Sequence, residues 1–214
     1  MYNYNAEQIF VVHPRNSGGG ILSFILSLDP LTPDLSFKKT STQEKINLWK
    51  KHLDSFEKDA HLFNFINYNS PRYYYNINNT ADFCHRYIQK CHFFELDSNK
   101  GEKNFLDCLN GKKRCIGIYL TDSCVDKLLS LRPQTSQTPD FYQKFIYSNL
   151  KKLLPTFYNI NVEHVLSFQE LLNLDVFLDH LNYCNEIFDL NINIDYARGV
   201  MLDWYKIIGG SNES

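Results

Sequence analysis

The sequence has no long apolar run, little glycine or proline, and almost no net charge. No stretch approaches about 20 consecutive apolar residues, so we expect no membrane span. The 9 Gly and 7 Pro in 214 residues exclude collagen-like and linker-like chains. A net charge of −2 provides no global basic field, and we therefore expect no nucleic-acid partner. The first residues lack a basic segment followed by an apolar one, so we expect no secretory signal.

The six cysteines include no Cys-x-x-Cys pair. An even count fits a disulfide framework, but such frameworks are typical of short secreted chains. We therefore expect a cytoplasmic protein whose thiols are mostly free and buried. Two Cys-His pairs, Cys84-His85 and Cys91-His92, suggest a metal site, but zinc-binding cysteines usually stand two to four residues apart. We expect no metal.

Apolar and aromatic residues are abundant, at 43% and 15% of the chain, and this content excludes intrinsic disorder. The length and the lack of a composition change predict a single domain over residues 1–214. Apolar runs predict strands over 8–14, 92–96, 114–120 and 162–167. Periodicity and stop signals predict helices over 21–28, 41–65, 81–89, 104–109, 122–131, 140–154, 169–188 and 195–208.

The predicted strands alternate with helices, and most are apolar on both faces. This pattern favours an α/β fold, with a mainly parallel central sheet in a three-layer α/β/α arrangement. Ser41 and Glu44 have the spacing of a capping box, which predicts where the second helix begins.

A glycine-rich loop separates the first predicted strand from the first predicted helix. Such a loop allows backbone N–H groups to approach a ligand, and the helix dipole adds about half a positive charge. It lacks the Gly-Lys-Ser/Thr of a Walker A loop, which disfavours a nucleoside triphosphatase. A tight strand-to-helix turn is the simpler alternative. The candidate anion-binding residues are Arg15, Asn16, Ser17, Gly18, Gly19 and Gly20.

The segment Val12–Pro30 resembles the opening of sulfotransferases that use 3′-phosphoadenosine 5′-phosphosulfate (PAPS) as donor. In that family a Pro-Lys/Arg-Ser-Gly-Thr-Thr loop precedes a leucine-rich helix. The resemblance implies a P-loop-like sulfotransferase core with Arg15 as the basic residue at the 5′-phosphosulfate. Ser17 and Gly18 then stand for the Ser-Gly of the family.

Two departures from the family pattern fall in the same loop. Asn16 is an insertion, and Gly19 and Gly20 replace the two threonines. The backbone amides remain available to an anion, but the two hydroxyl contacts are lost. A sulfuryl group carries one negative charge, so positioning and fixed positive groups can drive its transfer without a metal.

The triplet Lys90-Cys91-His92 resembles the Lys-Thr-His of cytosolic sulfotransferases, whose histidine is the general base. The resemblance implies that His92 removes the proton of the acceptor, a role suited to the ordinary histidine pKa of about 6.5. Lys90 would neutralise charge on the bridging oxygen. The alternative is a histidine that merely begins a strand.

The segment from Tyr119 to Ser130 is similar to the family pattern Tyr-x-x-Arg-Asn-x-x-Asp-x-x-x-Ser. Ser130 is retained, and the resemblance implies that it binds the 3′-phosphate of the donor. Asp122 stands where the family has its arginine. Either another basic residue contacts this phosphate, or the donor differs, or the site has decayed. Arg198 and Gly199 lie in a segment similar to the family's late 3′-phosphate motif, although an amphipathic helix explains that segment equally well.

The resemblance therefore implies a PAPS-dependent sulfotransferase acting on an unknown hydroxyl or amine acceptor, with Arg15, Lys90 and His92 as catalytic residues. Two other functions stay open. Asp122 favours a non-catalytic sulfotransferase-like module that binds a nucleotide or phosphate ester. A P-loop-like kinase or hydrolase is the other, although the missing Lys-Ser/Thr argues against it.

Overall fold

The computed structural model describes the following residues: 7–13, 17–32, 41–56, 86–92, 114–121, 124 and 162–208. Within them, four strands form one parallel sheet with helices packed against it, so the chain has an α/β fold. The strands are β1 (Glu7–His13), β2 (Arg86–His92), β3 (Arg114–Tyr119) and β4 (His164–Ser167). Their order is β2-β1-β3-β4, so β1 is hydrogen-bonded on both sides.

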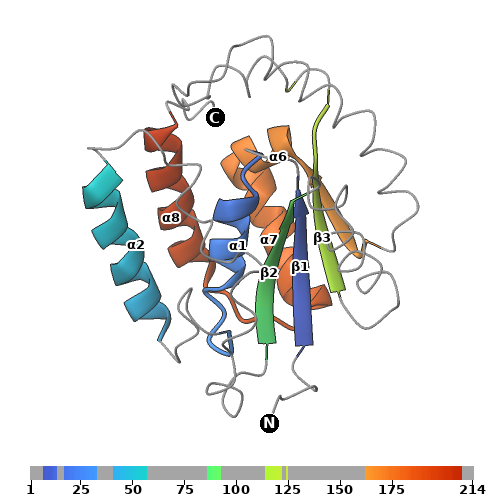
Figure 1. Cartoon of the computed structure of the whole chain (residues 1–214), viewed down its shortest axis with the longest axis horizontal. Helices are drawn as coiled ribbons and strands as arrows, with labels where there is room; N and C mark the ends of the chain where they lie inside the picture. Colours follow the sequence, from blue (N-terminus) through green and yellow to red (C-terminus); the bar gives the residue numbers. More distant parts are fainter. Residues whose placement is uncertain are drawn as a thin grey trace.

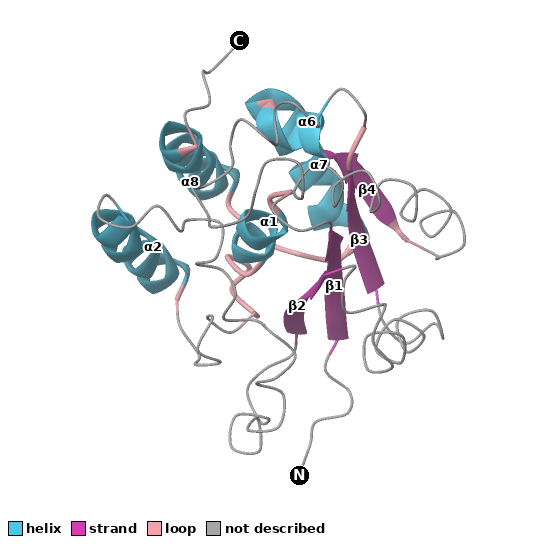
Figure 2. Ribbon diagram, turned by 45° about the horizontal axis from the view of Figure 1, so that its top comes forward, coloured by secondary structure: helices cyan, strands magenta, loops and turns pink. Residues whose placement is uncertain are grey.

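The described helices lie together on one side of the sheet (Figures 1 and 2). They are α1 (Gly19–Leu26), α2 (Thr42–Phe56), α6 (Phe168–Leu172), α7 (Leu174–Ile187) and α8 (Ile194–Ile207). Helix α1 packs on β1 and β2, and α8 packs on α1 and α7. Helix α2 packs against α8. Helix α1 is therefore enclosed, which explains why its sequence is apolar on every side.

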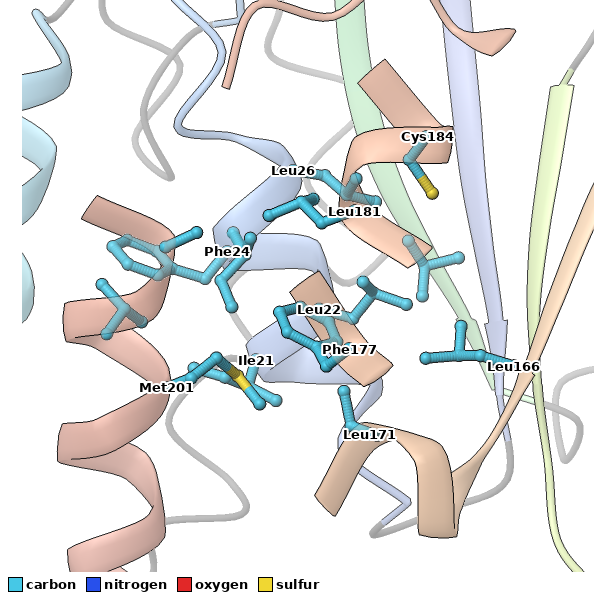
Figure 3. Close-up of a cluster of buried hydrophobic side chains, with 14 of the residues drawn as sticks. Ile21, Leu22, Phe24, Leu26, Leu166, Leu171, Phe177, Leu181, Cys184 and Met201 are labelled. Atoms are coloured by element: carbon cyan, nitrogen blue, oxygen red, sulfur yellow. The ribbon is translucent and has the colours of Figure 1, made fainter. Parts of the chain in front are cut away.

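The apolar side chains of these helices form one cluster with the sheet (Figure 3). Leu22 of α1 and Phe177 of α7 meet there, and Leu166 of β4 faces them. The side chains of Phe10, Val12 and Cys115 are as buried as this cluster but do not belong to it. Because side chains alternate along a strand, these three lie on the opposite face of the sheet. Both faces of the sheet are therefore buried.

A buried lysine fixes the end of α1. Lys45 of α2 is 1% exposed, and its Nζ donates hydrogen bonds to the carbonyl oxygens of Ser27 (2.6 Å), Asp29 (2.9 Å) and Thr32 (2.5 Å). The carboxylate of Asp29 accepts from Thr32 Oγ1 at 3.0 Å and from the backbone N–H of Asn191 at 3.0 Å. The carbonyl groups at the end of a helix need donors of this kind. One polar junction thus joins α1, α2 and the turn before α8.

Most of the predicted elements that fall on described residues are confirmed. Strands β1, β3 and β4 and helix α8 lie within two residues of the predicted bounds. The capping box is confirmed at 2.7 Å from Ser41 N to Glu44 Oε2 and 3.2 Å from Glu44 N to Ser41 Oγ. The predicted helices over 104–109 and 140–154 lie outside the described residues. Of the predicted helix over 122–131 only Cys124 is described, and it is helical.

The second strand was predicted in the wrong place. Residues 86–89 belong to β2 and not to a helix over 81–89, and β2 ends at His92 where the predicted strand begins. The sequence Arg-Tyr-Ile-Gln-Lys-Cys-His has little apolar periodicity of its own. Pairing with β1 over its whole length, from Glu7↔Arg86 to His13↔His92, overrides that weak local preference.

The predicted helix over 169–188 is two helices. Asn173 interrupts it with an extended backbone, and its side chain caps α7 by accepting from Val176 N at 3.2 Å. Asparagine competes with the helical backbone in this way and favours a cap over a helix interior.

No helix within the described segments is long and apolar enough to span a membrane. A single domain over residues 1–214 stays a prediction.

Candidate functional site

The carboxyl end of β1 and the beginning of α1 form the best candidate site. In the order β2-β1-β3-β4, the strand that follows β1 in the sequence lies toward one edge of the sheet, and the strand that follows β3 lies toward the other. Open parallel sheets bind ligands at the carboxyl ends of their strands, beside such a reversal of strand order. The residues that follow β1 are the predicted glycine loop, so sequence and topology point to the same place.

Gly18 provides the turn into α1. Its φ of 81° lies in the left-handed region, which a residue with a side chain rarely adopts. A Cβ atom at Gly18 would lie 2.3 Å from Leu171 Cδ2. As the N-cap residue, Gly18 offers no side-chain acceptor, and the first turn of α1 holds no acidic residue. The positive end of the helix dipole therefore has no carboxylate on its own helix to oppose it.

Gly19 has no room for a side chain, because the ring of His13 lies beside it. His13 was not selected in the sequence analysis. A Cβ atom at Gly19 would lie 2.0 Å from both Cγ and Cδ2 of His13. His13 is the last residue of β1 and is 2% exposed, and its imidazole is buried against the first turn of α1. A threonine at position 19, as in sulfotransferases, does not fit beside this ring. Alternation along β1 was the signal, because His13 shares a face with Ile9 and Val11.

The two residues proposed to act on the transferring group lie beside β1. Lys90 is the register partner of Val11, and His92 is the register partner of His13. The triplet therefore ends β2 at the same edge of the sheet as the glycine loop. Strand β2 was predicted to begin at about this point, whereas in the structure it ends there.

The other predicted site residues lie on α8, elsewhere in the loop, or outside the described residues. Arg198 lies on the exposed side of α8, and its guanidinium is 3.8 Å from the carboxylate of Asp175 on α7. Gly199 is also exposed and has no heavy atom within 4 Å of a Cβ position. Of the loop, Ser17 is fully buried and Gly20 is partly buried. Four predicted residues lie outside the described part of the chain: Arg15, Asn16, Asp122 and Ser130.

Helix α6 contacts the loop at Gly18, and α8 holds α6 in place through a hydrogen bond. Leu171 of α6 contacts Gly18, and the carbonyl oxygen of Leu171 accepts a hydrogen bond from Tyr205 Oη at 2.8 Å. Burial raises the pKa of Tyr205, so its phenol stays protonated and keeps donating at any physiological pH. This hydrogen bond fixes α6 relative to α8 and so fixes the wall against which Gly18 packs.

A second polar cluster joins β4, α6 and α7. His164 Nε2 of β4 and His180 Nδ1 of α7 are 2.9 Å apart, and Glu170 of α6 lies beside His180. Burial, and then the neighbouring His180, lower the pKa of His164 to about 4. Burial opposes the ionised form of Glu170, but hydrogen bonds from Ser167 together with the neighbouring His180 outweigh it and lower the pKa of Glu170. Nothing in the sequence spacing had indicated this cluster.

Comparisons with known protein families, with the curated proteins and with solved structures gave no significant match. The chemistry of the site therefore has to be argued from its own residues.

Proposed function

We propose that this chain is a sulfotransferase that moves a sulfuryl group from PAPS to a hydroxyl or amine acceptor. The observation that carries the proposal is the register of β1 and β2. It aligns Lys90 and His92 with the end of the strand that leads into the glycine loop. An anion site and a lysine-histidine pair at one edge of a parallel sheet fit a metal-free transfer of a charged group.

In the proposed reaction the backbone amides of Gly18, Gly19 and Gly20, with Arg15, hold the 5′-phosphosulfate. His92 takes the acceptor proton while the acceptor oxygen attacks sulfur. The bond from sulfur to the 5′-phosphate oxygen breaks, and 3′,5′-ADP leaves. Lys90 stabilises the negative charge that develops on the leaving oxygen.

The remaining predicted residues are assigned to the loop and to the far end of the donor. Asn16 and Ser17 belong to the loop that binds the phosphosulfate. Ser130 binds the 3′-phosphate, with Arg198 and Gly199 as further candidates. Arg198 would have to exchange its pairing with the exposed carboxylate of Asp175 for the donor phosphate, and such surface pairs are weak.

The proposal extends to the fold and the compartment. We propose a three-layer α/β/α arrangement with a P-loop-like sulfotransferase core. The burial of Phe10, Val12 and Cys115 on the second face of the sheet supports it. We also propose a cytoplasmic location, supported by the buried thiols of Cys124 and Cys184, which form no disulfide.

Calorimetric titration with 3′,5′-ADP tests the proposal. We expect binding to the wild-type chain and a loss of binding in Arg15→Ala. Lys206→Ala is the matched control, since Lys206 is an exposed cation at the end of α8, 77% exposed. We expect His92→Ala to retain 3′,5′-ADP binding but to lose transfer of labelled sulfate from PAPS. No binding to the wild type, or equal binding by Arg15→Ala, would overturn the proposal.

Asp122 favours a second candidate function, a non-catalytic module that binds a nucleotide or phosphate ester. A carboxylate at this position would repel a 3′-phosphate. The module is supported if the wild type binds 5′-AMP as tightly as 3′,5′-ADP and transfers no sulfate from PAPS. Asp122→Arg then separates the two candidates, because we expect it to restore preference for 3′,5′-ADP in a decayed donor site.

A further inference from the structure

Three elements bring a carboxylate and two imidazoles into a row that the proposed function does not use. His164 begins β4, His180 lies in the middle of α7, and Glu170 lies in α6. His180 Nδ1 is 2.9 Å from His164 Nε2, and His180 Nε2 is 3.7 Å from Glu170 Oε1. One nitrogen of His180 thus faces an imidazole, and the other faces a carboxylate.

We propose that His164 Nε2 and His180 Nδ1 together bind one divalent late transition-metal ion, such as Cu²⁺ or Ni²⁺. Imidazole nitrogens lie about 2.0–2.1 Å from a bound ion, so two nitrogens at a right angle on it are about 2.9 Å apart. The two nitrogens have that separation in this structure, where they share a hydrogen bond whose proton an ion would replace. Tetragonal sites with right angles and nitrogen or oxygen ligands suit Cu²⁺ and Ni²⁺.

Glu170 has the position of the carboxylate that orients a metal-binding histidine. Its Oε2 accepts a hydrogen bond from Ser167 N at 2.5 Å, and its own backbone N–H donates to Ser167 Oγ at 3.1 Å. This capping box holds the carboxylate in place while Oε1 faces His180. Metal-binding histidines commonly direct their second nitrogen to such a partner, which fixes the tautomer and the ring orientation.

The site is open enough for an ion and for the water needed to complete its coordination. The side chains of His180 and Glu170 are 22% and 38% exposed. Tyr183, which is 46% exposed, places its ring 5.0 Å from that of His164 and forms one wall. Within the described segments no group of three or more His, Cys, Asp or Glu is arranged to hold a metal. The proposed site therefore has two protein ligands, with water in the other positions.

Titration of the tag-free, chelator-treated chain with NiCl₂ tests the site, with MgCl₂ as the ion that imidazoles do not select. We expect one strongly bound Ni²⁺ per chain. Glu170→Gln keeps the capping box, because glutamine also serves at that position, and we expect it to weaken binding about 10- to 100-fold. We expect His164→Gln and His180→Gln to weaken it further. Asp179→Asn, next to His180 and exposed, is the control and is expected to bind as the wild type does.

A second measurement uses the wild-type chain alone, so that it does not depend on how the variants fold. We expect the electron paramagnetic resonance spectrum of one equivalent of Cu²⁺ to show coupling to two imidazole nitrogens. The chain has seven histidines in all, and the double variant in which both His164 and His180 are replaced distinguishes this site from the others. Equal Ni²⁺ binding by the wild type and the double variant His164→Gln/His180→Gln would overturn the proposal. Coupling to fewer than two nitrogens, or no binding at all, would do the same.

Discussion

The glycines of this chain have different structural requirements although they are the same residue. Gly19 is closed in by the imidazole of His13, whereas Gly199 has open space where a Cβ would stand. Three consecutive glycines suggested a ligand-binding loop. In the structure, backbone conformation and packing also explain why glycine occupies two of these positions. Gly18 needs its left-handed backbone, and Gly19 needs the absence of a Cβ.

We predict opposite effects of alanine at these two positions. Gly19→Ala places a methyl group within the His13 ring, and such overpacking costs about 1–3 kcal/mol of unfolding free energy. Gly199→Ala lies on the exposed side of α8, where alanine is favoured over glycine by about 1 kcal/mol. Urea denaturation of both variants measures the two effects. A Gly19→Ala variant as stable as the wild type would contradict the position of His13.

Cys184 is a buried thiol, and its reactivity follows from its environment. Burial raises its pKa to about 12, so almost no thiolate forms at neutral pH. Because the thiolate is the reactive species, we predict that Cys184 resists alkylation in the native chain and reacts readily in denaturant. Peptide mapping after iodoacetamide treatment with and without urea checks this. Rapid native labelling of Cys184 would show that α7 is not packed as described.

Among the elements, α1 depends most on its neighbours. It has eight residues, which is too few for an isolated helix to be stable in water. Apolar contacts stabilise its sides, and the ammonium group of Lys45 satisfies carbonyl groups at its end. The conformation of α1 therefore depends on its packing against the sheet and α8 and on the lysine that α2 contributes.

Replacing Lys45 tests this dependence. Lys45→Met keeps an apolar side chain of similar length but removes the donor to three buried carbonyl groups. We predict a loss of about 3 kcal/mol in unfolding free energy, because buried acceptors lose a charged donor. Lys50→Met on the exposed side of α2 is the control, and we expect a change within about 0.5 kcal/mol. A similar midpoint of urea denaturation for both variants would argue against the buried junction.

Elements with strong local signals were predictable from the sequence. Strand β3 is apolar along its length, and α8 has a clear apolar face, so both were predicted within a residue of their bounds. Strand β2 is different, because four of its seven residues are Arg, Gln, Lys and His. Its conformation is determined by pairing with β1, which no local pattern reveals. The break at Asn173 is likewise a capping preference that apolar periodicity concealed.

The candidate site was predictable in part for the same reason. The glycine loop follows a strand with a strong signal, so Gly18 and Gly19 could be found from the sequence. Alternation along β1 places His13 on the α1 side of the sheet, but its contact with Gly19 depends on the first turn of α1 returning over the end of β1. The row formed by His164, His180 and Glu170 arises from three elements, and only tertiary packing brings these side chains together.

At the scale of the whole molecule, β1 is the centre of the described structure. It is hydrogen-bonded to β2 and β3, and its residues from Ile9 to Val12 are at most 1% exposed. We predict that its backbone amides exchange with solvent more slowly than those of α2, by a factor on the order of 100. Hydrogen–deuterium exchange read by mass spectrometry measures this. Equal exchange in the two segments would mean that the sheet opens as easily as the outermost helix.

The position of β1 has a consequence for synthesis of the protein on the ribosome. Its two neighbours in the sheet come from residues 86–92 and 114–119, and the hydrogen bond from Asn191 to Asp29 joins residues 162 positions apart. At about 5–20 residues per second, the first strand leaves the ribosome many seconds before the segments that cover it. The apolar Ile-Phe-Val-Val of the nascent chain is thus exposed during that interval. An unpaired apolar strand can associate with other chains, so this segment is open to aggregation until the strands that cover it have been synthesised.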